Sequence, residues 1–137
     1  MEIQNKSKEY KATETTVYSC QYHVVFCPKY RRSVLIDGID IRLKEKAFEY
    51  CGGHQMELLD IEVMPYHVHM LLDIPPTKNT RNAVTLLKGY LAHELRKEFP
   101  TLKSRLPSLW TRSCFISSVG SVSLEVVKKY IENQKNK

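Results

Sequence analysis

Residues 57–74 contain two stretches of alternating apolar and polar side chains, separated by a two-residue turn. Alternation of this kind is typical of β-strands, because successive side chains point to opposite faces of a sheet. The pattern predicts strands at Glu57–Met64 and His67–Ile74, joined through Pro65-Tyr66. Strands joined by so short a turn pair antiparallel, so the fold must contain an antiparallel sheet.

The remaining elements predict how this sheet is built. Further strands are expected at 17–27 and 113–119, and helices at 40–51, 79–99 and 121–134. The order strand-helix-strand-strand-helix-strand, followed by a C-terminal helix, is the split βαβ or ferredoxin-like pattern of the α+β class. In that fold the two helices cover one face of the sheet, with Leu43, Ala47 and Phe48 expected on the buried side of the first. We expect the other face, which carries His67 and His69, to be free for a ligand.

The length of 137 residues fits one compact domain. We expect residues 1–14 to form a flexible arm and residues 15–137 a single domain. No apolar run approaches the ~20 residues needed to cross a bilayer, and the polar N-terminus lacks the apolar segment of a secretory signal. We therefore expect a cytoplasmic protein without membrane association, whose four scattered cysteines are free thiols.

Two residues near the C-terminus could form a site together with the histidine pair. His67 and His69 lie two positions apart in a strand, so both imidazoles project from one face. Tyr130 and Gln134 lie four positions apart in a helix, so they too share a face. Two imidazoles and an amide oxygen can hold a divalent metal beside a nucleophilic phenol, which suits phosphodiester cleavage through a covalent tyrosine intermediate. His23 would share the histidine face if the first and third strands are neighbours, and it could pack beside the pair or orient a phosphate.

Two other kinds of histidine site fit the sequence less well. A binuclear metallohydrolase motif would have an aspartate and a histidine where Leu71 and Leu72 stand. The two-histidine phosphoesterases need two separate His-x-Ser/Thr motifs, whereas this chain has one His-x-His.

The charge balance is compatible with a polyanionic partner. Lysine and arginine number 21 against 15 aspartates and glutamates, a net charge of +6. The loop Lys29-Tyr30-Arg31-Arg32 combines three cations with an aromatic ring, a combination suited to single-stranded nucleic acid. The other candidate DNA contacts are Lys88, Arg112, Lys128 and Lys129.

Several stretches, in the same order, resemble a known family. They are Tyr22–Phe26, Pro28–Arg32, Val63–His69, Leu86–Gly89, Leu109–Ser113 and Tyr130–Gln134. The chain resembles the single-tyrosine transposases of the smallest bacterial and archaeal insertion sequences, members of the HUH (histidine, hydrophobic, histidine) endonuclease superfamily. The resemblance covers about Tyr18 to Gln134.

The resemblance implies a role for each candidate. His67 and His69 would bind Mg²⁺ or Mn²⁺ with the Gln134 amide oxygen as third ligand. Tyr130 would attack a phosphodiester of single-stranded DNA, leaving a 5′-phosphotyrosine and a free 3′-hydroxyl. The family acts as a homodimer in which the tyrosine helix of one subunit can complete the histidine site of the other. It recognises DNA hairpins at element ends and needs no nucleotide cofactor.

One position departs from the family pattern and keeps alternatives open. The family usually has aspartate before the first histidine, where this chain has Tyr66. Asp73 or Glu62 could substitute for it, or the protein could bind hairpins without cutting them. A rolling-circle replication initiator or relaxase would share the chemistry but usually carries extra domains. A non-catalytic RNA-recognition module would share the element order, but its aromatic signature is absent from His67–Ile74.

Overall fold

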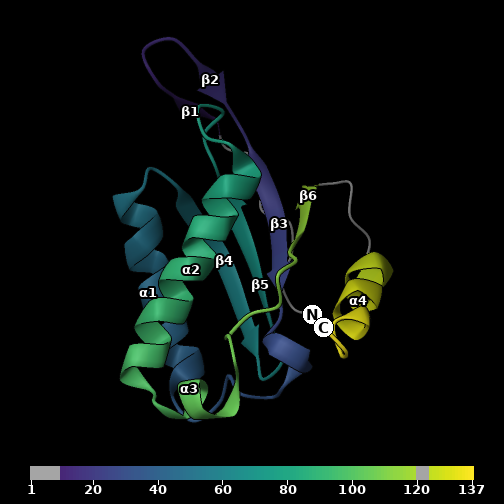
Figure 1. The fold of residues 1–137 in the computed structure, drawn as a ribbon. Helices are drawn as coiled ribbons and strands as arrows, with labels where there is room; N and C mark the ends of the chain where they lie inside the picture. The colour runs from purple at the N-terminus through teal and green to yellow at the C-terminus, as the bar shows by residue number, and fades with distance from the viewer. Residues whose placement is uncertain (1–9, 120–123) are drawn as a thin grey trace.

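A four-stranded antiparallel sheet forms the centre of the computed structural model, which describes residues 10–119 and 124–137 (Figure 1). Its strands are β3 (Gln21–Phe26), β4 (Glu57–Met64), β5 (His67–Asp73) and β6 (Phe115–Ser118). The spatial order is β4-β5-β3-β6, and every neighbouring pair is antiparallel. This is the strand order of a ferredoxin-like fold, so the predicted fold class is confirmed.

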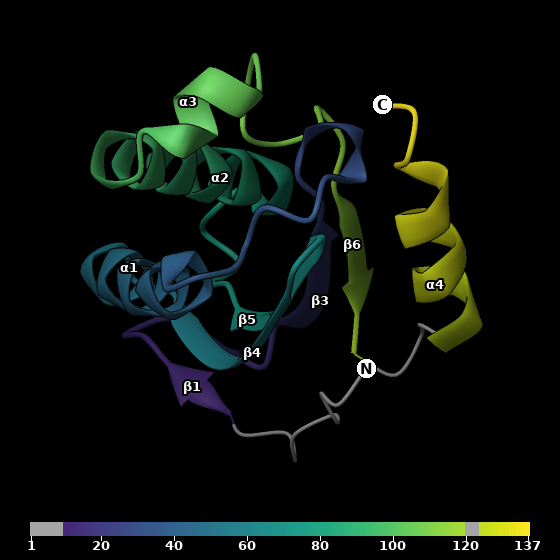
Figure 2. The same cartoon turned by 90° about the horizontal axis from the view of Figure 1, so that it is seen from below.

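Two helices, α1 (Ile39–Gly53) and α2 (Thr80–Glu98), lie side by side on one face of the sheet (Figures 1 and 2). The main core lies between these layers and includes Val24, Met70 and Leu87, all fully buried. Asn79 caps α2 by accepting a hydrogen bond from the Asn82 amide at 2.9 Å, which fixes where this helix begins.

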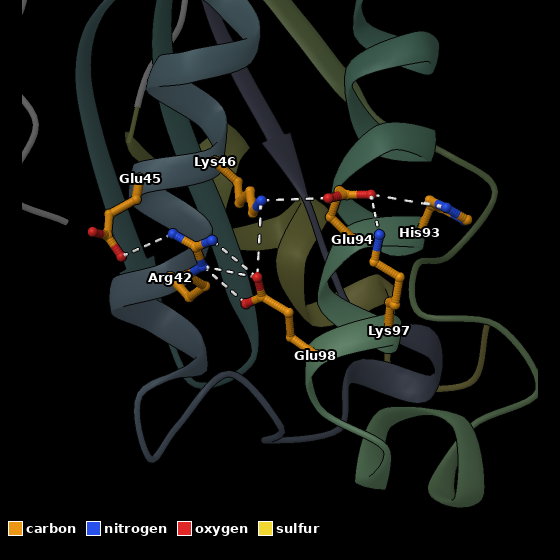
Figure 3. A network of polar contacts seen from close by, with 7 residues as sticks. All are labelled: Arg42, Glu45, Lys46, His93, Glu94, Lys97 and Glu98. Carbon is orange, nitrogen blue, oxygen red and sulfur yellow. Dashed lines mark hydrogen bonds and ion pairs between the residues drawn. The ribbon is translucent and has the colours of Figure 1, made fainter.

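Polar contacts tie α1 to α2 outside the core (Figure 3). Arg42 donates two close hydrogen bonds to the Glu98 carboxylate, at 2.8 and 2.9 Å. Lys46 donates to Glu94 at 3.3 Å. Since Arg42 and Glu98 are each about one third exposed, their contact fixes the relative position of the helices more than it adds stability.

The second face of the sheet is partly covered by α4 (Leu124–Asn133), which differs from the expectation of a free face (Figure 2). Val127 and Ile131 of α4 pack against Val25 and Cys27 in a second, smaller apolar cluster. Val25 points to this face because it stands opposite His69 in the register of β3 and β5. The C-terminal helix therefore lies on the same face as the histidines.

Four local features differ from the sequence predictions. Phe48 is 54% exposed rather than buried, because it lies on the outer side of α1. A bulge between Leu58 and Asp60 shifts the register of β4, so that Leu58 is buried in place of Leu59. The expected arm contains β1 (Lys11–Ala12), paired with β2 (Val17–Tyr18), and the 101–110 connection contains a short helix, α3 (Thr101–Arg105). Residues 1–9 of the arm and the expected start of the last helix at Ser121 lie outside the described residues.

Candidate functional site

The pleat of two neighbouring strands brings three histidines together. His67 and His69 project from β5, and His23 projects from the adjacent strand β3 onto the same face. His23 Nδ1 lies 2.9 Å from His69 Nε2, a hydrogen-bond distance. The expectation that His23 shares the face of the pair is therefore correct, and its contact is with His69.

The environment of these histidines favours neutral rings. All three are about 4% exposed. Burial lowers the pKa of His69 to about 4, and it lowers the pKa of His67, where the Glu62 carboxylate opposes the shift. Burial also lowers the pKa of His23. Neutral imidazoles are the form that binds metal ions.

The unpaired nitrogens of His67 bear on whether a metal fits here. Neither ring nitrogen has a hydrogen-bond partner among the described residues, and Glu62 Oε1 lies 3.9 Å from Nε2. Buried polar atoms are rarely left without partners, so a neutral, unpaired imidazole suits a ligand position. Across residues 10–119 and 124–137, however, no three histidine, cysteine or acidic side chains are arranged to hold an ion. The imidazoles fit a divalent cation, and a further ligand would have to come from elsewhere.

Tyr130 and Gln134 share one side of α4, as expected, and both contact Ser113. The phenol oxygen of Tyr130 lies 2.8 Å from Ser113 Oγ. The Ser113 hydroxyl donates a hydrogen bond to Gln134 Oε1 at 3.0 Å, so Ser113 Oγ accepts the hydrogen bond that the Tyr130 phenol donates. Burial raises the pKa of Tyr130 to about 12, and the Ser113 hydrogen bond offsets part of that rise. In this arrangement the phenol is neutral at pH 7.

The side of α4 that lies near His67 is not the side that carries Tyr130 and Gln134. Lys128 and Glu132 line a pocket together with His67. Tyr130 follows Lys128 by two residues, which turns it about 160° around the helix axis. The Gln134 amide oxygen, the expected third ligand, is occupied by Ser113. The structure thus brings Tyr130 and Gln134 to the histidine face but directs both toward Ser113.

Lys88 has a structural role, which corrects the expectation that it contacts DNA. Its ammonium group donates to the backbone oxygens of Thr111 and Ser113, at 2.9 and 2.8 Å. The residue is 8% exposed, and burial lowers its pKa. Lys88 therefore holds the segment that carries Ser113, a residue that sequence reasoning did not single out within the stretch Leu109–Ser113.

Replacing Lys88 by methionine is expected to destabilise the fold by about 1–3 kcal/mol, because two carbonyls inside the protein lose their donor. Urea unfolding would measure the change, with Lys44→Met, at an exposed position of α1, as the matched control. We also expect the salt dependence of DNA binding to stay as it is in the unmodified protein. Unchanged stability together with a weaker salt dependence would return Lys88 to the DNA-binding residues.

The remaining basic candidates lie at or near the surface. In η1 (Lys29–Arg31), Tyr30 and Arg31 adopt positive φ angles of 58° and 51°, and Tyr30 is 43% exposed. The guanidinium of Arg31 lies over the Tyr66 ring, 5.3 Å from its centroid. The exposed candidates are Arg32, Arg112, Lys128 and Lys129.

A pocket of about 420 Å³ adjoins His67. Arg31 and Lys128 supply its cations, Glu62 and Glu132 its carboxylates, and His67 part of its wall. The apolar lining consists of Met64, Tyr66 and Ile131.

No helix in the described ranges is long and apolar enough to cross a membrane.

Comparison with known proteins gives consistent matches along the chain. The family model described as "Transposase IS200 like" matches residues 16–134. The ISDra2 transposase TnpA of Deinococcus radiodurans is 34% identical over 131 residues, 94% of each chain. The transposase for insertion sequence element IS200 of Salmonella typhimurium is 29% identical over 90% of this chain and 82% of its own.

Two solved structures share the fold. A crystal structure described as a putative transposase from Deinococcus radiodurans superposes with a TM-score of 0.84 at 34% identity, covering 90% of this chain and 97% of the other. A REP-associated tyrosine transposase bound to a REP hairpin superposes with a TM-score of 0.54 at 12% identity, covering 96% of this chain and 69% of the other. At that identity the second match shows the fold alone.

Proposed function

The chain belongs to the IS200-like transposase family, and from this premise we propose that it cuts and rejoins single-stranded DNA through a covalent bond to Tyr130. As a transposase it is a DNA-cleaving enzyme, which favours this reading over the replication initiator and the RNA-recognition module. The observation that carries the proposal is a helix-borne tyrosine docked on the sheet face that holds the neutral, partly unpaired histidine pair.

The proposed step exchanges one phosphoester for another. The phenol oxygen of Tyr130 bonds to the scissile phosphorus and the bond to the 3′ oxygen breaks. The phenol loses a proton and the departing 3′ oxygen gains one, so no proton is consumed overall. Because the new ester has about the same energy as the old one, the reverse attack by a 3′-hydroxyl rejoins strands without a nucleotide cofactor.

We propose that His67 and His69 hold a divalent ion, Mg²⁺ or Mn²⁺, at this site. Such an ion supplies charge that polarises the phosphate and favours the phenolate. The histidines contribute neutral nitrogens, and His23 fixes the ring of His69 through the 2.9 Å contact. Glu62, 3.9 Å from His67, is the acidic residue that would assist in place of the aspartate that the family usually has where this chain has Tyr66.

The observed position of α4 is, on this proposal, an inactive arrangement. The phenol is protonated and hydrogen-bonded to Ser113, and it lies on the side of α4 that is away from His67. Cleavage would then require that α4 reposition, or that the helix come from a second subunit of a homodimer. Either route would free the Gln134 amide oxygen from Ser113 and make it available as a metal ligand.

Cys27 is expected to report this movement of α4. It lies beneath Val127 and Ile131, whereas Cys51 lies in the main core. Burial raises the pKa of Cys27 to about 12 and that of Cys51 to about 11, so both thiols should resist alkylation in the free protein. On binding single-stranded DNA and Mn²⁺, alkylation of Cys27 should accelerate at least tenfold while Cys51 stays protected. Equal protection of both thiols in the complex would show that α4 keeps its place.

Single-stranded DNA hairpins at the element ends are the proposed substrate. A structural neighbour is a transposase bound to a REP hairpin, and the basic loop at Lys29–Arg32 supports a nucleic-acid surface on this chain. The test incubates the protein with Mg²⁺ or Mn²⁺ and a hairpin oligonucleotide that carries a single-stranded flank. A peptide with nucleotide bound to Tyr130, found by mass spectrometry, is the expected result, and absence of any adduct with authentic element ends would contradict the proposal.

A further inference from the structure

We propose that the pocket between Arg31, Tyr66, His67 and Lys128 binds one nucleotide of the single strand, next to the phosphate that is cut, while α4 has the position seen here and before the ion and the strand together move it. This inference rests on the proposed function and adds a binding subsite to it. It also gives a role to Tyr66, the residue that departs from the family pattern. The pocket has the volume for a nucleotide, about 420 Å³, and His67 forms part of its wall.

The charges in the pocket suit one phosphate. Arg31 reaches it from η1 and Lys128 from α4, so two cations from distant parts of the sequence converge. Glu62 and Glu132 also line it, so two carboxylates balance the two cations. Carboxylates accept hydrogen bonds from the amino groups of a base. This mixture of charges favours one phosphate with its base over a run of several phosphates.

The apolar lining suits the face of a base. Tyr66 is half-buried, and the Arg31 guanidinium lies over its ring, 5.3 Å from the centroid. Both groups stack on nucleobases. Met64, 40% exposed, and Ile131 provide further apolar surface.

His67 links this pocket to the reaction site. Its ring is 4% exposed, lines the pocket and has no hydrogen-bond partner for either nitrogen among the described residues. The Tyr66 ring meets it edge-on, with the centroids 5.0 Å apart. A nucleotide stacked at Tyr66 would thus place its phosphate, or the next one, beside the histidine.

Fluorescence of 2-aminopurine tests the stacking. The probe is placed in turn at each position that flanks the cut, and binding is measured with the Tyr130→Phe protein without added metal ion, so that no cleavage occurs and α4 keeps its place. We expect quenching at one position, kept in the Tyr66→Phe variant and lost in Tyr66→Leu, with about tenfold weaker binding for the leucine variant. Melting curves would confirm that Tyr66→Leu is folded. Quenching at no position, or quenching that Tyr66→Leu leaves unchanged, would overturn the proposal.

Charge removal gives a second test that does not depend on Tyr66. Lys128→Gln should raise the dissociation constant for single-stranded DNA about three- to fivefold and reduce the slope of log affinity against log salt by about 0.7. The control is Lys44→Gln, which removes the same charge from an exposed position on α1, the helix on the opposite face. Equal effects of the two variants would contradict the pocket. An adduct at Tyr130 without either signature would overturn this inference alone, whereas no adduct and no binding would overturn the proposed function as well.

Discussion

Tyr130→Phe is expected to eliminate the covalent protein–DNA adduct completely, because phenylalanine has no oxygen to bond to phosphorus. The substitution keeps the ring that packs near Phe115, with centroids 5.6 Å apart, and the cluster around Val25 and Cys27. It removes the 2.8 Å contact with Ser113, one hydrogen bond at the protein surface, which costs about 1 kcal/mol. The variant should therefore fold and still bind single-stranded DNA. Denaturing gels and mass spectrometry would measure the adduct, and filter binding the affinity.

Two other tyrosines make this test specific. Tyr90→Phe removes a phenolic hydroxyl from α2, in the layer that covers the opposite face of the sheet, and should leave adduct formation unchanged. Tyr66 stands directly before His67 and could be taken for the nucleophile, so Tyr66→Phe must still yield the adduct. An adduct that persists in Tyr130→Phe and disappears in Tyr66→Phe would assign the nucleophile to Tyr66.

The elements that sequence periodicity predicts well are those whose partners lie close along the chain. β4 begins and ends where the alternation does, at Glu57 and Met64, and β5 follows it through a two-residue turn. Once β3 is placed beside β5 by the fold, the proximity of His23 and His69 follows from the pleat. The bulge at Leu58–Asp60 could not be predicted, because alternation assigns each residue one face and a bulge interrupts that count.

The residues that sequence reasoning missed act through backbone atoms or through contacts between distant segments. In the sequence, Lys88 looks like a surface cation in a helix. Only the fold shows that its ammonium group donates hydrogen bonds to the carbonyl oxygens of Thr111 and Ser113. Ser113 has no motif of its own, yet it contacts both Tyr130 and Gln134. Helical spacing correctly put those two residues on one side of α4. It could not say whether that side is directed at the histidines or at Ser113, since helical spacing fixes which residues share a side and not how the helix is rotated on the sheet.

The orientation of α4 has a physical explanation in the free protein. With no phosphate present, turning the phenol toward the histidines would exchange its hydrogen bond to Ser113 for contact with buried, neutral rings. Burial in the present arrangement raises the pKa of Tyr130 to about 12 and so favours the protonated phenol. A bound ion would reverse that balance by favouring the phenolate, and a phosphate held beside the ion would give the phenol oxygen its phosphorus to attack. Substrate and metal are therefore expected to draw Tyr130 from Ser113 together, neither being sufficient alone.

His67→Ala is expected to abolish metal-dependent cleavage, with at least a hundredfold loss of adduct, while hairpin affinity stays close to that of the unmodified protein. The loss is expected because the variant keeps only one imidazole of the pair. Even removal of a group that merely supports a metal ligand lowers metal affinity or activity about 10–100-fold. Stability should change little through hydrogen bonding, since neither ring nitrogen has a partner among the described residues. Adduct yield against Mn²⁺ concentration would measure the effect, with calorimetric titration of the ion alone.

His93→Ala is the matched control, since this histidine lies at the surface of α2 with its side chain 75% exposed, beside Glu94 (Figure 3). It should keep full adduct yield and the same Mn²⁺ affinity. Because the hairpin is expected to bind basic residues outside the histidine pair, its affinity separates a lost ion from a lost substrate. Cleavage by His67→Ala at the normal Mn²⁺ concentration would show that the ion, if one is needed, is held by other residues. Loss of hairpin binding and cleavage together would instead place His67 in DNA recognition, and the chemistry would then require a different centre.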